Sequence, residues 1–261
     1  MGSLLGRTAR VKTRLEWLSA LVYIGTVSTQ TAKLPRESTG KAPEEISPRM
    51  FDNPILEWGS RVHPIVPPLI YVPVISFLLS VAINAENLSV LPVIAVFVAG
   101  LAFWTFFEYT LHRFVFHFRP DNDWGRKLHF IMHGVHHDYP HDPMRLVMPP
   151  AVSIPLAIIM YFVFRGVLGP EWSLPAFAGF LLGYLIYDMG HYHIHHHRSD
   201  NKLSLALRRY HYRHHFQQSD RGFGVTSPLW DRVFRTSPVI RRRRAAKRAA
   251  ASGSKSAPKS A

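Results

Sequence analysis

The sequence has no cysteine in its 261 residues. This absence excludes disulfide bonds, thiolate metal sites and iron–sulfur clusters, although it leaves the cellular compartment open. Any metal that the chain binds must therefore be held by nitrogen and oxygen ligands. The sequence also has no internal repeat apart from several short histidine-rich boxes.

Four apolar stretches have no charged residue: 65–83, 88–107, 151–164 and 174–187. The first two are long enough to span a bilayer of about 30 Å as helices. The last two are short, so a buried helix of a soluble protein, or a helix only partly in the bilayer, remains an alternative. Short connections, 84–87 and the Gly-Pro turn in 166–173, join the stretches into two hairpins.

Acidic residues are few, with 17 Asp and Glu against 31 Lys and Arg and a formal net charge of +14. Such a charge can indicate nucleic-acid binding. If both short connections lie on one side of a membrane, however, every basic residue except Arg165 lies on the other. This positive-inside distribution predicts cytoplasmic termini and no nucleic-acid partner. We expect an all-α integral membrane protein, with four transmembrane helices in two hairpins and a cytoplasmic helical cap.

Three regions are predicted along the chain. Residues 1–64 form a cytoplasmic segment whose apolar stretch 15–28 is read as an interfacial or core-packing helix rather than a signal peptide. Residues 65–240 form the membrane domain. Residues 241–261 form a basic, disordered tail that is either solvated or attracted to anionic headgroups.

The sixteen histidines cluster beside the apolar stretches, on the predicted cytoplasmic side. On an α-helix, His129, His133, His136 and His137 share one arc, and His191 and His195 share one face. His211, His214 and His215 repeat the same i, i+3, i+4 spacing. His112 and His117 are five residues apart, so a kink or bulge is needed to aim both at one point.

Neutral imidazole is the commonest metal-binding side chain, and one structural zinc takes four ligands. About ten convergent histidines therefore indicate two metal ions. Five other histidines share no face with these and are interpreted as bystanders: His63, His141, His193, His196 and His197.

Four segments, "HRFVFH", "HFIMHGVHH", "YDMGHYHIHH" and "RRYHYRHH…GFGVTSPLWDRVF", resemble the fatty acid hydroxylase branch of the membrane sterol desaturase/hydroxylase superfamily, most of all the fatty acid 2-hydroxylases. The resemblance covers about residues 50–236. It implies a dinuclear metal centre that uses O2 to hydroxylate carbon 2 of a long or very long acyl chain, free or within ceramide. The ligands that it implies are His112, His117, His133, His136, His137, His191, His195, His211, His214 and His215, with His129 as an accessory residue.

The reaction favours iron, because zinc has no redox chemistry, although an isolated protein could contain zinc. Many eukaryotic relatives carry an N-terminal cytochrome b5 domain, for which 64 residues leave too little room. The expected electron donor is therefore a separate cytochrome b5 with its reductase, or a ferredoxin. The expected membrane is the endoplasmic reticulum in a eukaryote and the inner membrane in a bacterium.

Two acids and six aromatic residues allow two interpretations each. Asp188 and Glu108 could accept a hydrogen bond from a ligand imidazole, or they could be ordinary polar residues at a helix end. The aromatic residues could line an acyl path or simply pack; they are Trp104, Phe106, Phe107, Tyr109, Phe114 and Phe116.

Two alternative functions remain open. The first is a desaturase or sterol-type methyl oxidase with the same metal core. The second is a metal transporter, which would place its ligands near the bilayer midplane, whereas these histidines lie outside the apolar stretches.

Overall fold

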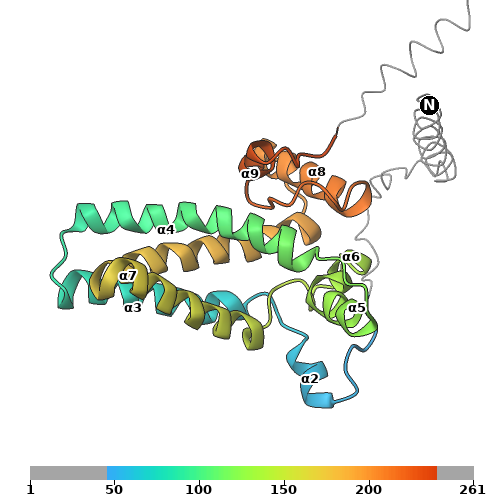
Figure 1. Ribbon diagram of the computed structural model, residues 1–261, viewed down its shortest axis with the longest axis horizontal. Coiled ribbons are helices and arrows are strands. Elements are labelled where there is room, and N and C mark those ends of the chain that lie inside the picture. Colours follow the sequence, from blue (N-terminus) through green and yellow to red (C-terminus); the bar gives the residue numbers. More distant parts are fainter. Residues whose placement is uncertain (1–45, 240–261) are drawn as a thin grey trace, which may run out of the picture. The chain divides into compact units, whose positions relative to one another are not determined.

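The computed structural model describes residues 46–239, in which every regular element is a helix (Figure 1). The predicted apolar helix 15–28 and the predicted tail 241–261 lie outside the described residues. In chain order the α-helices are α2 Pro54–Gly59, α3 Val66–Ser80, α4 Val90–Thr110, α5 Asp123–His129, α6 Val135–Asp138, α7 Pro150–His196, α8 Lys202–Phe216 and α9 Leu229–Val233. Three π-helical segments continue or join them: η1 Val81–Ala85, η2 Leu111–Phe116 and η3 Phe130–Gly134.

Three helical segments are long and apolar enough to cross a membrane by length and composition: Val66–Ala85, Val90–Phe116 and Pro150–His196. The first two correspond to the predicted stretches 65–83 and 88–107. The second is longer than predicted, because η2 extends α4 beyond Thr110. The all-helical, membrane-capable fold is thus confirmed.

Helix α7 contains a reversal at Gly169. Its φ of 78° and ψ of 173° are non-helical values that glycine adopts most readily, and Pro170 follows. In a continuous helix Phe164 and Phe180 would be about 24 Å apart, yet their ring centroids are 5.4 Å apart. The limbs 150–168 and 170–196 are therefore antiparallel, as the predicted Gly-Pro turn requires. That each limb crosses a bilayer separately stays a prediction.

The helices α4 and α7 approach each other closely at two glycines. A Cβ atom on Gly100 would lie 1.9 Å from the Ala176 carbonyl oxygen, and one on Gly179 would lie 1.9 Å from the Phe97 carbonyl oxygen. Small residues permit such backbone contact between membrane helices. The pair of glycines fixes the distance between α4, which leads to His112, and α7, which carries His191 and His195.

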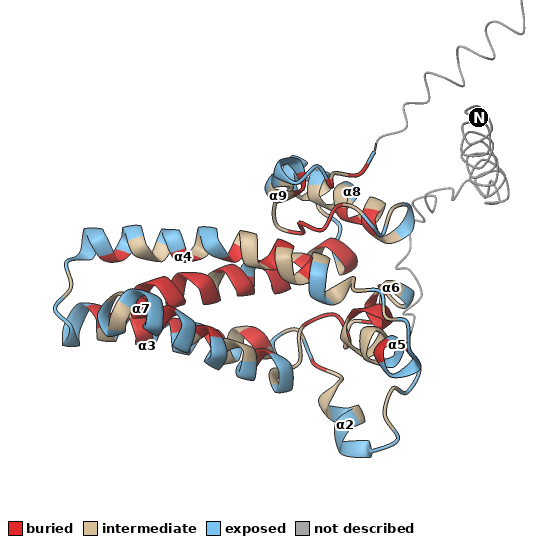
Figure 2. Cartoon of the chain, in the orientation of Figure 1, coloured by how far each residue is buried: buried red, intermediate tan, exposed pale blue. Residues whose placement is uncertain are grey.

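The outer surfaces of the membrane-capable helices are apolar and open. Leu91 is 78% exposed, Leu69 66% and Phe162 62%. Buried residues gather along the 170–196 limb of α7, whereas exposed ones follow its 150–168 limb and the outer side of α4 (Figure 2). A continuous apolar surface of this kind is typical of contact with lipid.

Helix α2 is anchored beside the membrane segments by one carboxylate. Glu57 accepts hydrogen bonds from the backbone N–H groups of Met50 and Phe51 and pairs with Arg61 and Arg145. Burial acts to raise the pKa of Glu57, but these hydrogen bonds and charges outweigh it and lower the pKa to about 2. The carboxylate thus stays ionised and holds the segment before α3 in place.

Candidate metal centre

Ten histidines converge in two groups of five. Within each group, one ligand-capable nitrogen per residue lies within 4.8 Å of all the others. Group one comprises His112, His117, His133, His137 and His214, and group two comprises His136, His191, His195, His211 and His215. These are the ten residues that the sequence analysis named as candidate ligands. That they bind metal stays a prediction.

The bulge expected between His112 and His117 is present as the π-helical segment η2. The His117 N–H donates to the His112 carbonyl across five residues, with N···O 3.1 Å. The wider turn brings residues i and i+5 onto one face. As a result the Nε2 atoms of His112 and His117 are 3.2 Å apart.

Each H-x-x-H-H box divides its histidines between the groups. His133 and His137, four residues apart, enter group one, while His136 enters group two. The box on α8 does the opposite, since His211 and His215 enter group two and His214 enters group one. Helices α6 and α8 therefore serve both groups, whereas the α4–η2 segment serves only the first and α7 only the second.

The two groups adjoin each other. The rings of His137 and His215, one from each group, stack with centroids 4.1 Å apart and planes at 13°. The ring of His136 in group two lies 5.5 Å from that of His133 in group one. Two ions held in these groups would be neighbours in one site rather than occupants of separate sites.

The distances within each group suit metal coordination. In group one the Nε2 atom of His133 is 3.0 Å from that of His112 and 3.1 Å from that of His137. In group two the Nε2 atom of His211 is 2.8 Å from that of His191 and 3.0 Å from that of His195. Metal–nitrogen bonds of about 2.0–2.1 Å would separate adjacent ligand atoms by roughly 2.9–3.4 Å. Five nitrogens this close cannot all satisfy one another as donors and acceptors, so the donor set fits a cation in each group.

The protonation of the site also suits metal binding. Burial, followed by the charges of neighbouring imidazoles, lowers the pKa of His117 to about 3. Burial likewise lowers the pKa of His214 to about 4, against the opposing effect of its backbone hydrogen bond. Burial also holds the pKa values of His133 and His211 well below their ordinary range. These imidazoles are neutral at pH 7, which is the form that binds metal.

Backbone carbonyls fix two rings of group one. The Nδ1–H of His112 donates to the Phe223 carbonyl at 2.5 Å, and the Nδ1–H of His214 donates to the Arg221 carbonyl at 2.8 Å. Each bond selects the tautomer whose Nε2 is free to bind a metal. Residue spacing does not predict this arrangement, although the closely spaced glycines in "GFGVTS" are a signal of an unusual loop conformation.

The two candidate acids have partners other than the ligand rings that they were expected to orient. The Asp188 oxygens accept from the Met148 N–H and the Tyr184 hydroxyl. Glu108 accepts from the N–H groups of Val225 and Thr226, while the Phe223 carbonyl takes the Nδ1–H of His112. Of the two interpretations offered for Glu108, the one with a hydrogen bond from His112 is therefore not observed. Glu108 acts on the loop after α8 instead.

The remaining histidines lie outside both groups, as predicted for His63, His141, His193, His196 and His197. His129 also lies outside them and packs on Phe118, with ring centroids 5.6 Å apart. It ends α5 and is followed directly by the π-helical segment η3, which carries His133.

Most of the six candidate aromatic residues pack rather than line a channel. Trp104 and Phe107 contact Phe180 in the core between α4 and α7. Phe106 packs on Trp230, and Tyr109 stacks on Phe234. Phe116 stacks on His133, while Phe114 is 60% exposed and lines a cavity.

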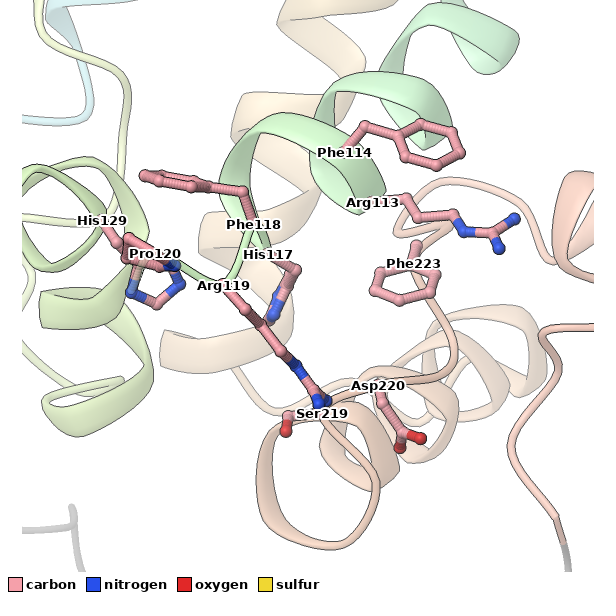
Figure 3. Close-up of a pocket in the computed structure, with 10 residues that line it drawn as sticks. All are labelled: Arg113, Phe114, His117, Phe118, Arg119, Pro120, His129, Ser219, Asp220 and Phe223. Atoms are coloured by element: carbon pink, nitrogen blue, oxygen red, sulfur yellow. The ribbon is translucent and has the colours of Figure 1, made fainter. Parts of the chain in front are cut away.

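That cavity, of about 510 Å³, opens beside group one. Its size falls within the ordinary range for ligand sites. His117 points into it between Arg119 and Phe223 (Figure 3). The cavity is lined by Arg113, Phe114, His117, Phe118, Arg119, Pro120, His129, Ser219, Asp220 and Phe223. It thus combines aromatic walls, two guanidinium groups and one candidate metal ligand.

Comparison with known proteins identifies the family. A family model described as fatty acid hydroxylase matches residues 97–236. The chain belongs to the fatty acid hydroxylase family. The predicted family is therefore confirmed, and the chain is an enzyme, an oxidoreductase. The match spans both H-x-x-H-H boxes, α7 and the loop after α8.

Individual relatives agree with this assignment. The dihydroceramide fatty acyl 2-hydroxylase FAH1 of Arabidopsis thaliana is 37% identical over 194 residues, which cover 74% of this chain and 81% of the relative. The fatty acid 2-hydroxylase of Mus musculus is 37% identical over 210 residues, covering 72% of this chain and 56% of the relative. A solved structure, described as full length scs7p with only the hydroxylase domain visible, is 37% identical with a TM-score of 0.67. It covers 72% of this chain, and the chain covers 70% of it.

Proposed function

We propose that this enzyme uses O2 to hydroxylate carbon 2 of a long or very long fatty acyl chain, free or within ceramide. The observation that carries the proposal is the convergence of ten histidine nitrogens in two adjoining groups beside apolar helices. The names of the relatives, which include a dihydroceramide fatty acyl 2-hydroxylase, support the substrate class and the position of attack.

Each group of five is proposed to hold one metal ion, through the Nε2 atoms. Imidazole binds iron, copper, nickel and zinc alike, so the reaction decides the metal. We assign iron to the working enzyme. When bound, two iron ions would supply the redox chemistry that activates O2 toward an unactivated C–H bond. The protein contributes neutral, buried imidazoles in a fixed orientation.

The cavity beside His117 is proposed to receive the polar head of the substrate. Carbon 2 is bonded to the carbonyl carbon, about 1.5 Å away, so the head group must lie next to the reacting atom. The cavity is next to group one and offers Arg113 and Arg119 to a carbonyl or carboxylate oxygen. The exposed Phe114 stands at the end of the α4–η2 helix, where an acyl tail could enter from the membrane.

The reaction requires two electrons and two protons besides O2. One oxygen atom forms the new C–O bond and the other leaves as water. Within residues 46–239 the two metal-ligand groups both belong to this one site. We propose that a separate donor supplies the electrons, cytochrome b5 with its reductase or a ferredoxin. Purified protein given only NADPH and O2 should be nearly inactive, and sustained turnover under those conditions would contradict this assignment.

The membrane arrangement is proposed as four crossings, formed by α3, α4 and the two limbs of α7. The reversal at Gly169 and the exposed apolar surfaces support it. The distribution of basic residues, with Arg165 alone on the opposite side, supports cytoplasmic termini. The membrane would be the endoplasmic reticulum in a eukaryote or the inner membrane in a bacterium, with the hydroxylase domain over 65–240.

Lipid analysis tests the function. The chain is expressed in a host that lacks 2-hydroxy fatty acids, grown under ¹⁸O₂, and the hydrolysed lipids are examined by mass spectrometry. We expect 2-hydroxy fatty acids that carry one ¹⁸O atom. His137→Ala should abolish them, and His63→Ala, which changes a histidine outside both groups, should leave them unchanged. New double bonds would favour the alternative desaturase, and no new lipid from folded, metal-loaded protein would contradict the proposal.

A further inference from the structure

The segment 221–226, which we call the clasp, lies between α8 and α9 and accepts hydrogen bonds from two histidines of group one. Its Arg221 carbonyl accepts from His214, and its Phe223 carbonyl accepts from His112. The two rings come from different helices, α8 and the α4–η2 segment. One short piece of backbone therefore sets the orientation of two candidate ligands at once.

Two buried carboxylates hold the clasp by its N–H groups. Glu108, 3% exposed, accepts on Oε1 from Val225 N at 2.6 Å and Thr226 N at 2.9 Å. Asp231, fully buried, accepts on Oδ1 from Phe223 N at 3.0 Å and on Oδ2 from Gly224 N at 2.8 Å. Every N–H from 223 to 226 thus donates to one of these two side chains.

The glycines of the clasp are required by its path. Gly222 has a φ of +77°, which side-chain-bearing residues rarely adopt. A Cβ atom on Gly224 would lie 2.1 Å from the Ser227 carbonyl oxygen. Trp230 donates its indole N–H to Thr105 at 3.0 Å and so ties the following helix to α4. In the stretch "GFGVTSPLWD" the glycines therefore permit the backbone path of the loop, and Asp231 at its end accepts hydrogen bonds from the loop's N–H groups.

We propose that Glu108 and Asp231 are positioning residues that control metal retention in group one, acting through the clasp on His112 and His214. The inference rests on the proposed function, since it requires these histidines to bind metal. Group two has no comparable support from this loop. Within the described residues, the Nδ1 atoms of its His195, His211 and His215 are buried without a hydrogen-bond partner.

The hydrogen-bond pattern predicts that amide variants of the two acids differ. In Glu108 both backbone N–H groups use one oxygen, and the other oxygen accepts from the Thr226 hydroxyl. A Glu108→Gln side chain can keep the oxygen there and donate its NH₂ to the hydroxyl, which also accepts. In Asp231 the two backbone N–H groups donate to different oxygens. The Asp231→Asn variant must therefore place its NH₂ group opposite one of these N–H groups, which is left without an acceptor.

Asp142 provides a matched control. It is also buried, and it also accepts two N–H groups on different oxygens, from Ser47 on Oδ2 and from Met144 on Oδ1, as well as the Ser47 hydroxyl. These partners lie outside both histidine groups. Asp142→Asn should therefore impose a similar defect on the fold without touching the clasp.

The experiment counts bound metal per chain in the full-length protein, purified in detergent and saturated with Zn²⁺ before removal of the excess. We expect about two ions for the wild type, Glu108→Gln and Asp142→Asn. We expect about one for Asp231→Asn and Glu108→Leu. The double variant Asp231→Asn/His117→Ala, in which both changes affect group one, should keep about one ion. The double variant Asp231→Asn/His215→Ala, in which the second change affects group two, should keep almost none.

The outcomes separate the clasp from the proposed function. A wild type that binds no metal would remove the proposed function itself. If the wild type binds two ions and the Asp231→Asn protein also keeps both, only the role proposed for the clasp in metal retention would be refuted. Equal loss from both groups in Asp231→Asn, or the same loss in Asp142→Asn, would mean that Asp231 merely stabilises the fold, and would overturn it as well.

Discussion

Adding one methyl group at Gly179 should separate α4 from α7. The new Cβ atom would lie 1.9 Å from the Phe97 carbonyl oxygen, whereas ordinary van der Waals contact begins at 3.4 Å. The α4 backbone must therefore recede locally by about 1.5 Å, since neither a carbonyl nor a helical Cβ can rotate away. Overpacking of this kind costs about 1–3 kcal/mol of unfolding free energy.

The assay is a thermal unfolding curve of the purified protein in detergent, recorded beside a matched variant. For a chain of this size the cost corresponds to a fall in the midpoint of roughly 2–12 °C. Gly190→Ala places a methyl on the same helix, where no atom lies within 4 Å. Alanine is the better helix former, so this control should be neutral or stabilised by up to about 1 kcal/mol.

The reciprocal contact sharpens the test. Gly100→Ala should cost a similar amount, because its Cβ atom would lie 1.9 Å from the Ala176 carbonyl oxygen. The two changes act on one helix crossing, so the double variant should lose less than the sum of the single losses. A Gly179→Ala protein that melts like Gly190→Ala, or fully additive losses, would refute the close approach.

Three further predictions concern the site, the membrane and pH. His195→Ala should abolish product and lower the bound metal, whereas His193→Ala should change neither, because only His195 enters a group; equal losses from the two variants, measured by metal and lipid analysis, would refute this. Tag-accessibility mapping should find the C-terminus cytoplasmic, and a tag on the far side would overturn the topology. The Glu57 carboxylate, with its pKa lowered from 4.5 to about 2, contributes stability above pH 4.5 that is lost as the pH falls toward 2. Hydrogen exchange in α2 should therefore rise across that interval, and Glu57→Gln should remove the pH dependence.

Residue spacing predicted the helices and the convergent histidines, because both follow from local geometry. The absence of charge in 65–83 and 88–107 predicted two membrane-capable helices, and the Gly-Pro turn predicted the reversal in α7. The five-residue separation of His112 and His117 required a bulge, which is present as η2.

Contacts between distant segments could not be predicted in the same way. Spacing placed His129 in one arc with His133, yet only His133 enters a histidine group. Spacing placed Glu108 on the side of His112, yet its partners Val225 and Thr226 come from a loop more than 100 residues later. The division of each H-x-x-H-H box between two groups likewise depends on which helices flank it.

Anomalous X-ray diffraction from crystals of the full-length protein, collected at the absorption edge of the bound metal, would locate the metal ions directly. We expect two peaks per chain, one among the five Nε2 atoms of each histidine group. A single peak, or peaks away from these ten histidines, would contradict it.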